Sequence, residues 1–326
     1  MVTPSLIERR LHFVVGKGGV GKTTVSGALA LLLARRGCRT LAIEMEVTGR
    51  LASLLGHPAA SYAPTEVAPN LHVLSVDGRA ALEEYLGLII PVRRLLSTVL
   101  ASTVYQYFVA AAPGLKELMT VGKIWYEATR EERGRRVWDA IVVDSAATGH
   151  SLQYLRMPQA ARETFGAGLV QREATKIVAL LQDRRTTAVH LVTLGEEMPV
   201  AETLETRAQL VGPLAMPLGW VIVNRLHGRR FDPALLERLR AAAGAAAPPA
   251  RGLLACVAER AAEESGWTEL NAAHLERLRA GIDGAPLVEL PFLFTEEFDR
   301  ASVERLSQVL EAAVPARGRA AGRRTP

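Results

Sequence analysis

A glycine-rich run near the N-terminus constrains this chain more than any other feature. Residues 16–24 read Gly-Lys-Gly-Gly-Val-Gly-Lys-Thr-Thr, which fits the P-loop (Walker A) pattern and adds a lysine at its second position. Residues 12–15 have the apolar composition of a short buried strand, and residues 25–34 that of an apolar helix. A glycine-rich turn that binds nothing is the weaker interpretation, because strand, loop and helix follow one another as a phosphate-binding loop requires.

The residues of this loop have distinct expected roles. Glycines let backbone N–H groups point inward at phosphate oxygens, and the following helix adds the positive end of its dipole. We expect Lys22 to reach the β- and γ-phosphates of ATP, and the Thr23 hydroxyl to bind Mg²⁺. The expected nucleotide-binding residues of the loop are Gly16, Gly18, Gly19, Val20, Gly21, Lys22, Thr23 and Thr24.

Lys17 has a different expected role. A lysine at the second loop position need not contact the phosphates of its own chain, and would instead reach across a dimer interface like an arginine finger. The alternative is a solvated loop lysine. The chain has five lysines, and two of them, Lys17 and Lys22, fall in this loop, which favours a catalytic role for Lys17.

Short apolar segments alternate with helical patterns along the chain, at residues 12–15, 40–43, 72–76, 140–143, 190–193, 220–223 and 288–290. This alternation predicts an α/β P-loop NTPase fold, with a mostly parallel central sheet flanked by helices. Helical periodicity replaces the strand pattern at 78–137 and at about 151–185, so we expect one ATPase domain over 1–326 with an inserted helical subdomain. The Ala/Gly/Pro-rich residues 241–251 predict a loop, and the arginine-rich residues 315–326 predict a disordered basic tail.

Polar residues that follow two of these strands complete the phosphate end of the expected site, because the carboxyl ends of parallel strands meet at one edge of a sheet. Asp144 follows residues 140–143, where it would hold Mg²⁺ together with Thr23 and serve catalysis. Glu46 lies shortly after residues 40–43, where it would orient the attacking water, with Glu44 as the weaker candidate. An aspartate that only caps a turn is the alternative, which the P-loop upstream disfavours.

The base end of the site is less sharply defined. Asn224 follows residues 220–223, where its amide would hydrogen-bond the adenine edge. Pro291 follows residues 288–290 and would stiffen the other wall of the base pocket. An asparagine that merely caps a turn is the competing interpretation.

Composition narrows the classes of partner. The net charge is +5, but the arginines are spread along helices and interleaved with Glu, so nucleic acid is not the expected partner. The two cysteines, Cys38 and Cys256, lie far apart without a CxxC pattern, so neither a disulfide framework nor a zinc site is predicted. No signal peptide precedes the first strand and no apolar run approaches the roughly 20 residues that span a bilayer, so we expect a cytoplasmic protein.

Together, the two-lysine loop, the Asp-Ser-Ala-Ala-Thr-Gly-His run at 144–150, the strand end at Asn224 and the Leu-Pro pair at 290–291 resemble the ArsA-type ATPases. That family includes the arsenite-pump ATPase and the targeting factor for tail-anchored membrane proteins. The resemblance implies a Mg²⁺-dependent, ATP-hydrolysing dimer, formed with a second copy or with a related ATPase chain, in which Lys17 acts in trans. It implies that Asp144 begins the second switch, that Asn224 reads the adenine, and that Glu46 stands where the family has a first-switch aspartate.

Three departures from the family bear on the substrate. The zinc-binding CxxC of the targeting factor is missing, as are the clustered cysteines of the arsenite pump, and Ala147 replaces the usual proline. The apolar residues of the insertion, interrupted by Pro91 and Pro113, would form a groove for the hydrophobic helix of a client or membrane protein. Core packing, or burial of the same surface in a dimer, is the alternative.

Two rival functions stay open. A partition or septum-positioning switch, which binds membrane or DNA when ATP drives dimerisation, shares the two-lysine loop but usually lacks the long helical insertion. An iron-sulfur-bridged ATPase needs two thiolates per chain near the dimer axis, which Cys38 is badly placed to supply. We therefore favour an ATPase whose nucleotide cycle controls a hydrophobic client or membrane partner.

Overall fold

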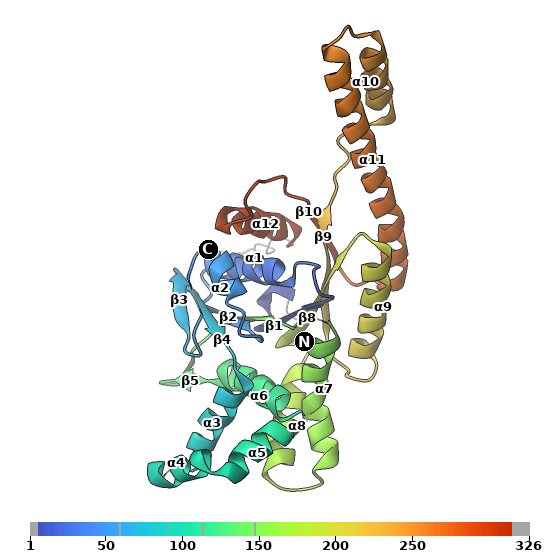
Figure 1. Cartoon of the computed structure of the whole chain (residues 1–326). Helices are drawn as coiled ribbons and strands as arrows, with labels where there is room; N and C mark the ends of the chain where they lie inside the picture. The colour runs from blue at the N-terminus through green and yellow to red at the C-terminus, as the bar shows by residue number, and fades with distance from the viewer. Residues whose placement is uncertain (1–5, 59, 91, 113, 147, 315–326) are drawn as a thin grey trace, which may run out of the picture.

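The computed structural model describes residues 6–314, except residues 59, 91, 113 and 147. The expected tail at 315–326, together with Pro91, Pro113 and Ala147, lies outside the described residues. Within them, a short 3₁₀ turn (Leu6–Glu8) precedes an eight-stranded sheet of order β10-β9-β8-β1-β7-β2-β4-β3 at the centre of the molecule (Figure 1). Its strands are β1 (Leu11–Gly16), β2 (Thr40–Glu44), β3 (Thr65–Ala68), β4 (Leu71–Ser75), β7 (Ala140–Asp144), β8 (Thr187–Leu194), β9 (Leu218–Leu226) and β10 (Leu287–Pro291).

The strands of this sheet run parallel to their neighbours, except β3, which is antiparallel to β4. The expected mostly parallel α/β fold is therefore confirmed. Each of the seven apolar segments in the sequence coincides with a strand. β3 was missed because it lies at the edge of the sheet, where its residues are only partly buried and show no apolar run.

Both faces of the sheet are covered, which explains the continuous apolar runs of its strands. In β1, the side chains of Leu11, Phe13 and Val15 enter one hydrophobic cluster, and that of Val14 enters the other. Helices α1 (Lys22–Arg35), α2 (Arg50–Leu54) and α12 (Arg300–Ala313) cover one face, and α9 (Glu197–Val211) belongs to the opposite layer (Figure 1). Helix α1 is buried all round between the sheet and α12.

Most of the remaining helices gather on the face opposite α12 (Figure 1). They are α3 (Gly78–Ile89), α4 (Arg93–Ala101), α5 (Thr103–Ala111), α6 (Leu115–Thr129), α7 (Thr148–Thr164) and α8 (Leu169–Gln182), with the hairpin β5 (Glu131–Glu132) and β6 (Arg135–Arg136) after α6. The sequence predicts helix at 78–137 and 151–185, and these helices account for most of both stretches, but residues 131–136 form the hairpin instead. Their outer part has a small core of its own around Leu82, Tyr105 and Val109.

The loop expected at 241–251 exists but is much shorter than predicted. Helices α10 (Pro233–Ala245) and α11 (Ala250–Gly281) form an antiparallel hairpin, and only residues 246–249 connect them. The hairpin projects from the body of the molecule (Figure 1). The prediction gave Gly and Pro too much weight, whereas alanine, which dominates this stretch, has the strongest intrinsic preference for helix.

Two buried histidines form a continuous chain of hydrogen bonds across the sheet. The backbone N–H of Trp220 donates to Nδ1 of His190 (3.0 Å), Nε2 of His190 lies 3.1 Å from Nδ1 of His12, and Nε2 of His12 lies 2.7 Å from the carbonyl oxygen of Arg9. Because Nδ1 of His190 accepts, its Nε2 donates to His12, whose own Nε2 then donates to Arg9. Both rings are therefore neutral. Burial lowers the pKa of both side chains, that of His12 to about 4.

This histidine pair predicts a loss of stability in acid. An unfolded histidine has a pKa of about 6.5, so between that pH and the lower native pKa the unfolded chain binds protons that the native chain excludes. The free energy of unfolding should fall as the pH drops below about 6.5, by up to about 1.4 kcal/mol per pH unit for each histidine. Urea unfolding at a series of pH values measures the slope. His274→Gln, which changes a histidine on α11, is the control and should keep this slope. A free energy of unfolding that does not change with pH in this range would contradict the neutral pair.

Candidate functional site

The loop between β1 and α1 depends on glycine at three points. Gly19 and Gly21 have φ values of 87° and 92°, in the left-handed region that favours glycine. Gly16 ends β1, where a Cβ atom would lie 2.3 Å from the carbonyl oxygen of Val192. Helix α1 begins at Lys22, so its positive N-terminal end lies at the loop, as an anion site requires.

A cavity of about 940 Å³ lies against this loop, where the strands of the sheet end. Its volume is within the usual range for small-molecule sites. The expected site residues that line it are Gly18, Gly19, Gly21, Lys22, Thr23, Thr24, Glu46 and Asp144. The structure therefore brings both carboxylates, the phosphate-binding type of lysine, Lys22, and the loop hydroxyls together around one space.

Several lining residues were not anticipated. Arg50 begins α2, Arg225 directly follows Asn224, Phe298 and Asp299 precede α12, and Arg300 begins it. Arg225 also has a positive φ of 55°, which is unusual for a residue with a side chain. With Lys22, the three arginines at 50, 225 and 300 give the cavity four cationic side chains. The lining also has four carboxylates, at positions 44, 46, 144 and 299, and the combination suits a polyphosphate bound with a divalent cation.

Five expected site residues lie outside the cavity lining: Gly16, Lys17, Val20, Asn224 and Pro291. The Val20 side chain is buried in the hydrophobic cluster beneath α1, and Gly16 is the close-packed end of β1. Pro291 is exposed at the end of β10. The expected nucleotide contacts of these residues stay predictions.

Asp144 and Lys22 lie at the centre of the site. Burial raises the pKa of Asp144 to about 6, against the opposing effect of hydrogen bonds from the Thr23 and Ser26 hydroxyls and of the Lys22 charge. The Ser26 bond measures 3.0 Å. Burial likewise lowers the pKa of Lys22, and the charges of Asp144 and Glu46 oppose that change. Because its native pKa is raised, the contribution of Asp144 to the free energy of unfolding falls as the pH rises towards 6. The contribution of the histidine pair changes in the opposite direction, since it rises with pH.

The two glutamates after β2 have different surroundings. Glu44 is buried and accepts hydrogen bonds from the backbone N–H groups of Gly49 (3.1 Å) and Arg50 (3.0 Å), and from the Thr48 hydroxyl. It therefore shapes the turn that leads into α2 and stabilises the N-terminus of that helix. Glu46 is exposed and lines the cavity, and its side chain forms no hydrogen bond with any other residue that the structure describes. It therefore stays the better candidate for orienting water.

Asn224 contacts the phosphate loop itself. Its side-chain amide is buried and donates to the carbonyl oxygen of Val20 (2.9 Å). A Cβ atom on Gly21 would lie 2.3 Å from the same amide nitrogen. Asn224 therefore supports the loop from behind in this structure, a role that the sequence did not indicate.

Lys17 is held within its own chain. Its Nζ forms an ion pair of 2.5 Å with Glu202 of α9, and both side chains are about one-third exposed. Lys22 donates to the carbonyl oxygen of Lys17 (3.0 Å), so the two lysines of the loop are linked through the backbone. To act on a partner's nucleotide, Lys17 would have to leave Glu202.

The loop, the helix N-terminus and the strand-end aspartate at the carboxyl edge of a parallel sheet define a P-loop nucleotide-binding protein. A family model described as anion-transporting ATPase, ArsA_ATPase, matches residues 9–173. The chain belongs to this family, and it is an ATPase.

Curated relatives agree with this assignment. ATPase BagA of Mycobacterium tuberculosis is 33% identical over 323 residues, which cover 92% of each chain. An arsenical pump-driving ATPase of Escherichia coli is 29% identical over 240 residues, covering 71% of this chain and 37% of the relative. Among the residues that the structure describes, no helix is long and apolar enough to cross a membrane.

The contact of Asn224 with the loop predicts the effect of its removal. Asn224→Ala should weaken ATP and GTP binding by a similar factor, about tenfold, because the loop would lose its support in the free protein and would have to be ordered on binding, at a cost comparable to the roughly 1–3 kcal/mol of a lost buried hydrogen bond. Displacement of a fluorescent nucleotide measures both affinities. Asn271→Ala is the control, because it removes another buried amide, which donates to the Gly195 carbonyl away from the cavity. A loss confined to ATP would instead indicate that Asn224 reads adenine.

Proposed function

We propose that this chain is a Mg²⁺-dependent ATPase of the cytoplasm that works as a dimer, and whose nucleotide cycle controls binding of a hydrophobic client segment. The observation that carries the proposal is the short connection between the phosphate loop and an apolar groove. Asp144 lies beside the phosphate loop, and α7 begins four residues later and packs against the helices of an apolar groove.

In the nucleotide site, Lys22 and the loop N–H groups would hold the phosphates. The Thr23 hydroxyl and the Asp144 carboxylate supply oxygen donors of the kind that Mg²⁺ takes, and they hydrogen-bond one another in the structure. The bound ion would neutralise phosphate charge. Glu46 would orient water for attack on the γ-phosphate, with a side chain one methylene longer than the family's aspartate.

The apolar groove lies among α3, α6 and α8 and has a volume of about 620 Å³. Its lining consists of Ala81, Leu82, Glu84, Tyr85, Leu86, Leu88, Ile89, Leu115, Leu118, Met119, Gly122, Lys123, Trp125, Tyr126, Phe165, Leu169, Val170, Glu173, Ala174 and Ile177. Leu88 is 63% exposed and Phe165 49% exposed at its rim. Large apolar side chains left in contact with water indicate a binding surface, and α-helical segments bind such grooves through their apolar faces.

The size of the groove supports a dimer. The helices that line the groove, α3, α6 and α8, have 12, 15 and 14 residues, so the longest of them measures about 22 Å. A membrane-spanning segment of about 20 residues is about 30 Å long. One chain therefore covers only a part of such a client, and a second chain would have to supply more of the surface.

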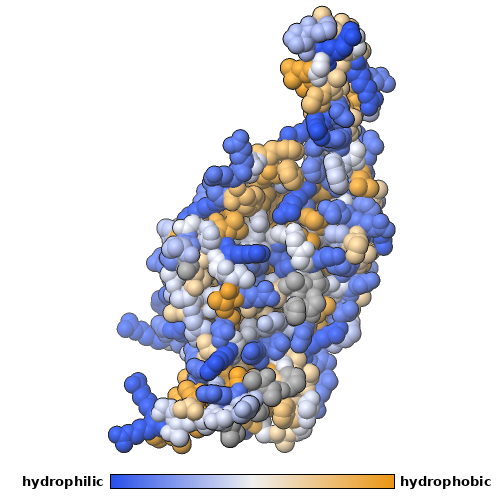
Figure 2. Space-filling view, viewed as in Figure 1, coloured by the Kyte–Doolittle hydropathy of each residue, from blue (hydrophilic) through white to orange (hydrophobic). Residues whose placement is uncertain are grey.

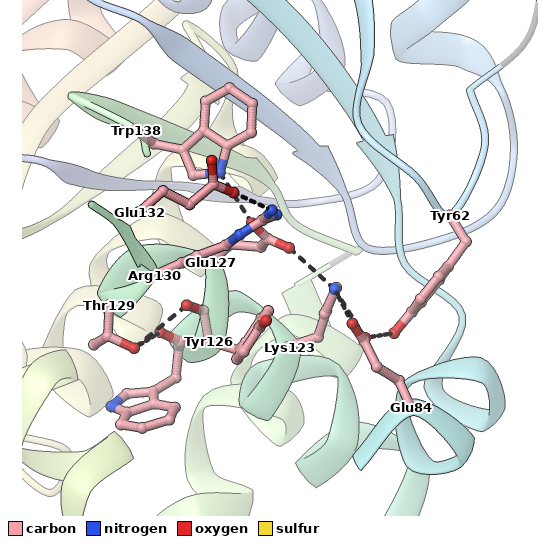
Figure 3. Close-up of polar contacts among 10 residues, drawn as sticks. Tyr62, Glu84, Lys123, Tyr126, Glu127, Thr129, Arg130, Glu132 and Trp138 are labelled. Carbon is pink, nitrogen blue, oxygen red and sulfur yellow. Dashed lines mark hydrogen bonds and ion pairs between the residues drawn. The ribbon is translucent and has the colours of Figure 1, made fainter. Parts of the chain in front are cut away.

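A buried polar network joins the groove to the sheet (Figure 3). Nζ of Lys123 lies 2.8 Å from Glu84 of α3 and 3.0 Å from Glu127 of its own helix. Glu127 in turn accepts a hydrogen bond of 2.9 Å from the indole of Trp138, which lies just before β7. Because β7 ends at Asp144, this network supports the proposal that nucleotide state reaches the groove.

The dimer is tested by ATP turnover at increasing protein concentration. Specific activity should rise with concentration, because each site would need a lysine from the partner. Lys22→Ala should abolish nucleotide binding or turnover. Lys17→Ala should bind ATP normally and lose about 10³-fold or more in turnover, as expected for a lost finger-type cation.

Two controls separate catalysis in trans from local structure. Glu202→Gln breaks the ion pair of Lys17 but keeps the lysine, so it should retain turnover. A mixture of Lys17→Ala and Lys22→Ala chains should recover part of the activity, since the second supplies Lys17 to the intact site of the first. Equal losses in Lys17→Ala and Glu202→Gln, without recovery on mixing, would show that Lys17 acts only within its chain.

The client is tested with a fluorescent peptide that carries a leucine-rich helix of membrane-spanning length. Leu88→Glu places a charge on the exposed rim of the groove and should weaken peptide binding by at least tenfold, whereas basal ATP turnover should persist. Val211→Glu is the control, because Val211 is 43% exposed at the end of α9 and outside the groove. Equal binding by the two variants would contradict a client site here.

A further inference from the structure

The hairpin of α10 and α11 extends well beyond the contacts that fix it to the body. Its root is held by Glu264, which lies 3.0 Å from His227, and by Asn271, which donates to the Gly195 carbonyl (2.8 Å). From Glu264 to the start of α11 at Ala250 there are 14 residues, or about 21 Å of helix. Figures 1 and 2 show this outer part standing clear of the remaining structure.

The end of the hairpin, residues 238–258, has an unusual composition. It contains three arginines, Arg238, Arg240 and Arg251, and its other residues are all Ala, Leu, Gly, Pro, Cys or Val. No charged or polar side chain occurs from residue 241 to residue 250. Beyond them, Leu253 is 69% exposed and Val257 41% exposed. Small side chains also let the two helices approach closely, with Ala243, Ala258 and Ala261 buried between them.

Charge is segregated along the hairpin. Residues 238–258 contain three arginines and no Asp or Glu, whereas residues 259–276 of α11 contain five glutamates and one arginine, Arg260. Arg238 and Arg240 are exposed on α10, beside the uncharged tip. An anionic surface would therefore attract the end of the hairpin and repel its acidic root, so that the hairpin would meet such a surface tip first.

We propose that this tip, residues 238–258, binds the surface of a membrane that contains anionic lipids. The apolar tip would enter the interface, and the arginines would contact the lipid phosphates, which is the two-part attraction that anchors peripheral proteins. A protein partner fits less well, because protein interfaces centre on large aromatic anchors that fill pockets, and the tip contains no aromatic residue. This inference does not rest on the proposed client groove or nucleotide cycle.

Co-sedimentation of the full chain with vesicles tests the proposal. The chain should bind phosphatidylcholine vesicles that contain phosphatidylglycerol, bind vesicles of phosphatidylcholine alone at least tenfold more weakly, and dissociate at high salt. Arg238→Glu with Arg240→Glu should lower the bound fraction at least tenfold, and so should Leu253→Asp. These side chains are exposed, so the variants should unfold at the same urea concentration as the wild type.

A matched variant controls for net charge. Arg277→Glu with Arg305→Glu makes the same change of charge at exposed positions on the body end of α11 and on α12, and should keep vesicle binding. No binding to anionic vesicles, or equal loss in both double variants, would overturn the proposal. Sedimentation velocity without lipid provides a further test. If only the tip variants changed the oligomeric state, the proposal would also be overturned, because the tip would then bind a second copy of the chain.

Discussion

The parallel register of the central sheet determines where the polar residues of the site lie. Val14 of β1 is opposite Asp144 of β7, and Asp144 is opposite Glu44 of β2. Asn224 lies on β9, two strands away from the phosphate loop in the other direction. A slip of one residue in any of these pairs would turn the polar side chain to the other face of the sheet. The relative positions of the phosphate loop, Asp144 and Asn224 therefore depend on one set of backbone hydrogen bonds, those of the sheet.

The two faces of the sheet carry different parts of the proposed activity. The face with α1, α2 and α12 surrounds the cavity, and the opposite face carries the groove. The network of Lys123, Glu84 and Glu127 lies between the groove and the sheet. Removing such charges from water costs free energy that the ion pairs only partly recover, so the network adds little net stability. Its consequence is geometric, since it holds α3 and α6 in one position relative to β7.

Much of the fold was predictable because the parallel strands are buried on both faces and appear as uninterrupted apolar runs. The loop at 16–24 was predictable because its conformation needs glycine at defined positions. The direction in which a side chain points could not be predicted in the same way. The contact of Asn224 with Val20 therefore became visible only in the structure, where the positions of β9 and β1 are known. Arg50, Arg225 and Arg300 were missed because each is an ordinary arginine in sequence, brought to the cavity by elements far apart in the chain. The excess length of the loop predicted at 241–251 has another cause, since the helix preference of alanine outweighed the turn preference of Gly and Pro except at residues 246–249.

Four consecutive residues at the end of β9 connect three parts of the molecule. Asn224 holds the phosphate loop, Arg225 lines the cavity, and His227 contacts Glu264 at the root of the hairpin. The hairpin thus has the geometry of a lever whose short end lies at the nucleotide cavity. A rotation of about 10° at the root displaces an arm of about 21 Å by about 4 Å at its tip. A small rotation at the β9 end would therefore be amplified at the tip to a displacement only slightly smaller than the spacing of about 4.8 Å between neighbouring strands.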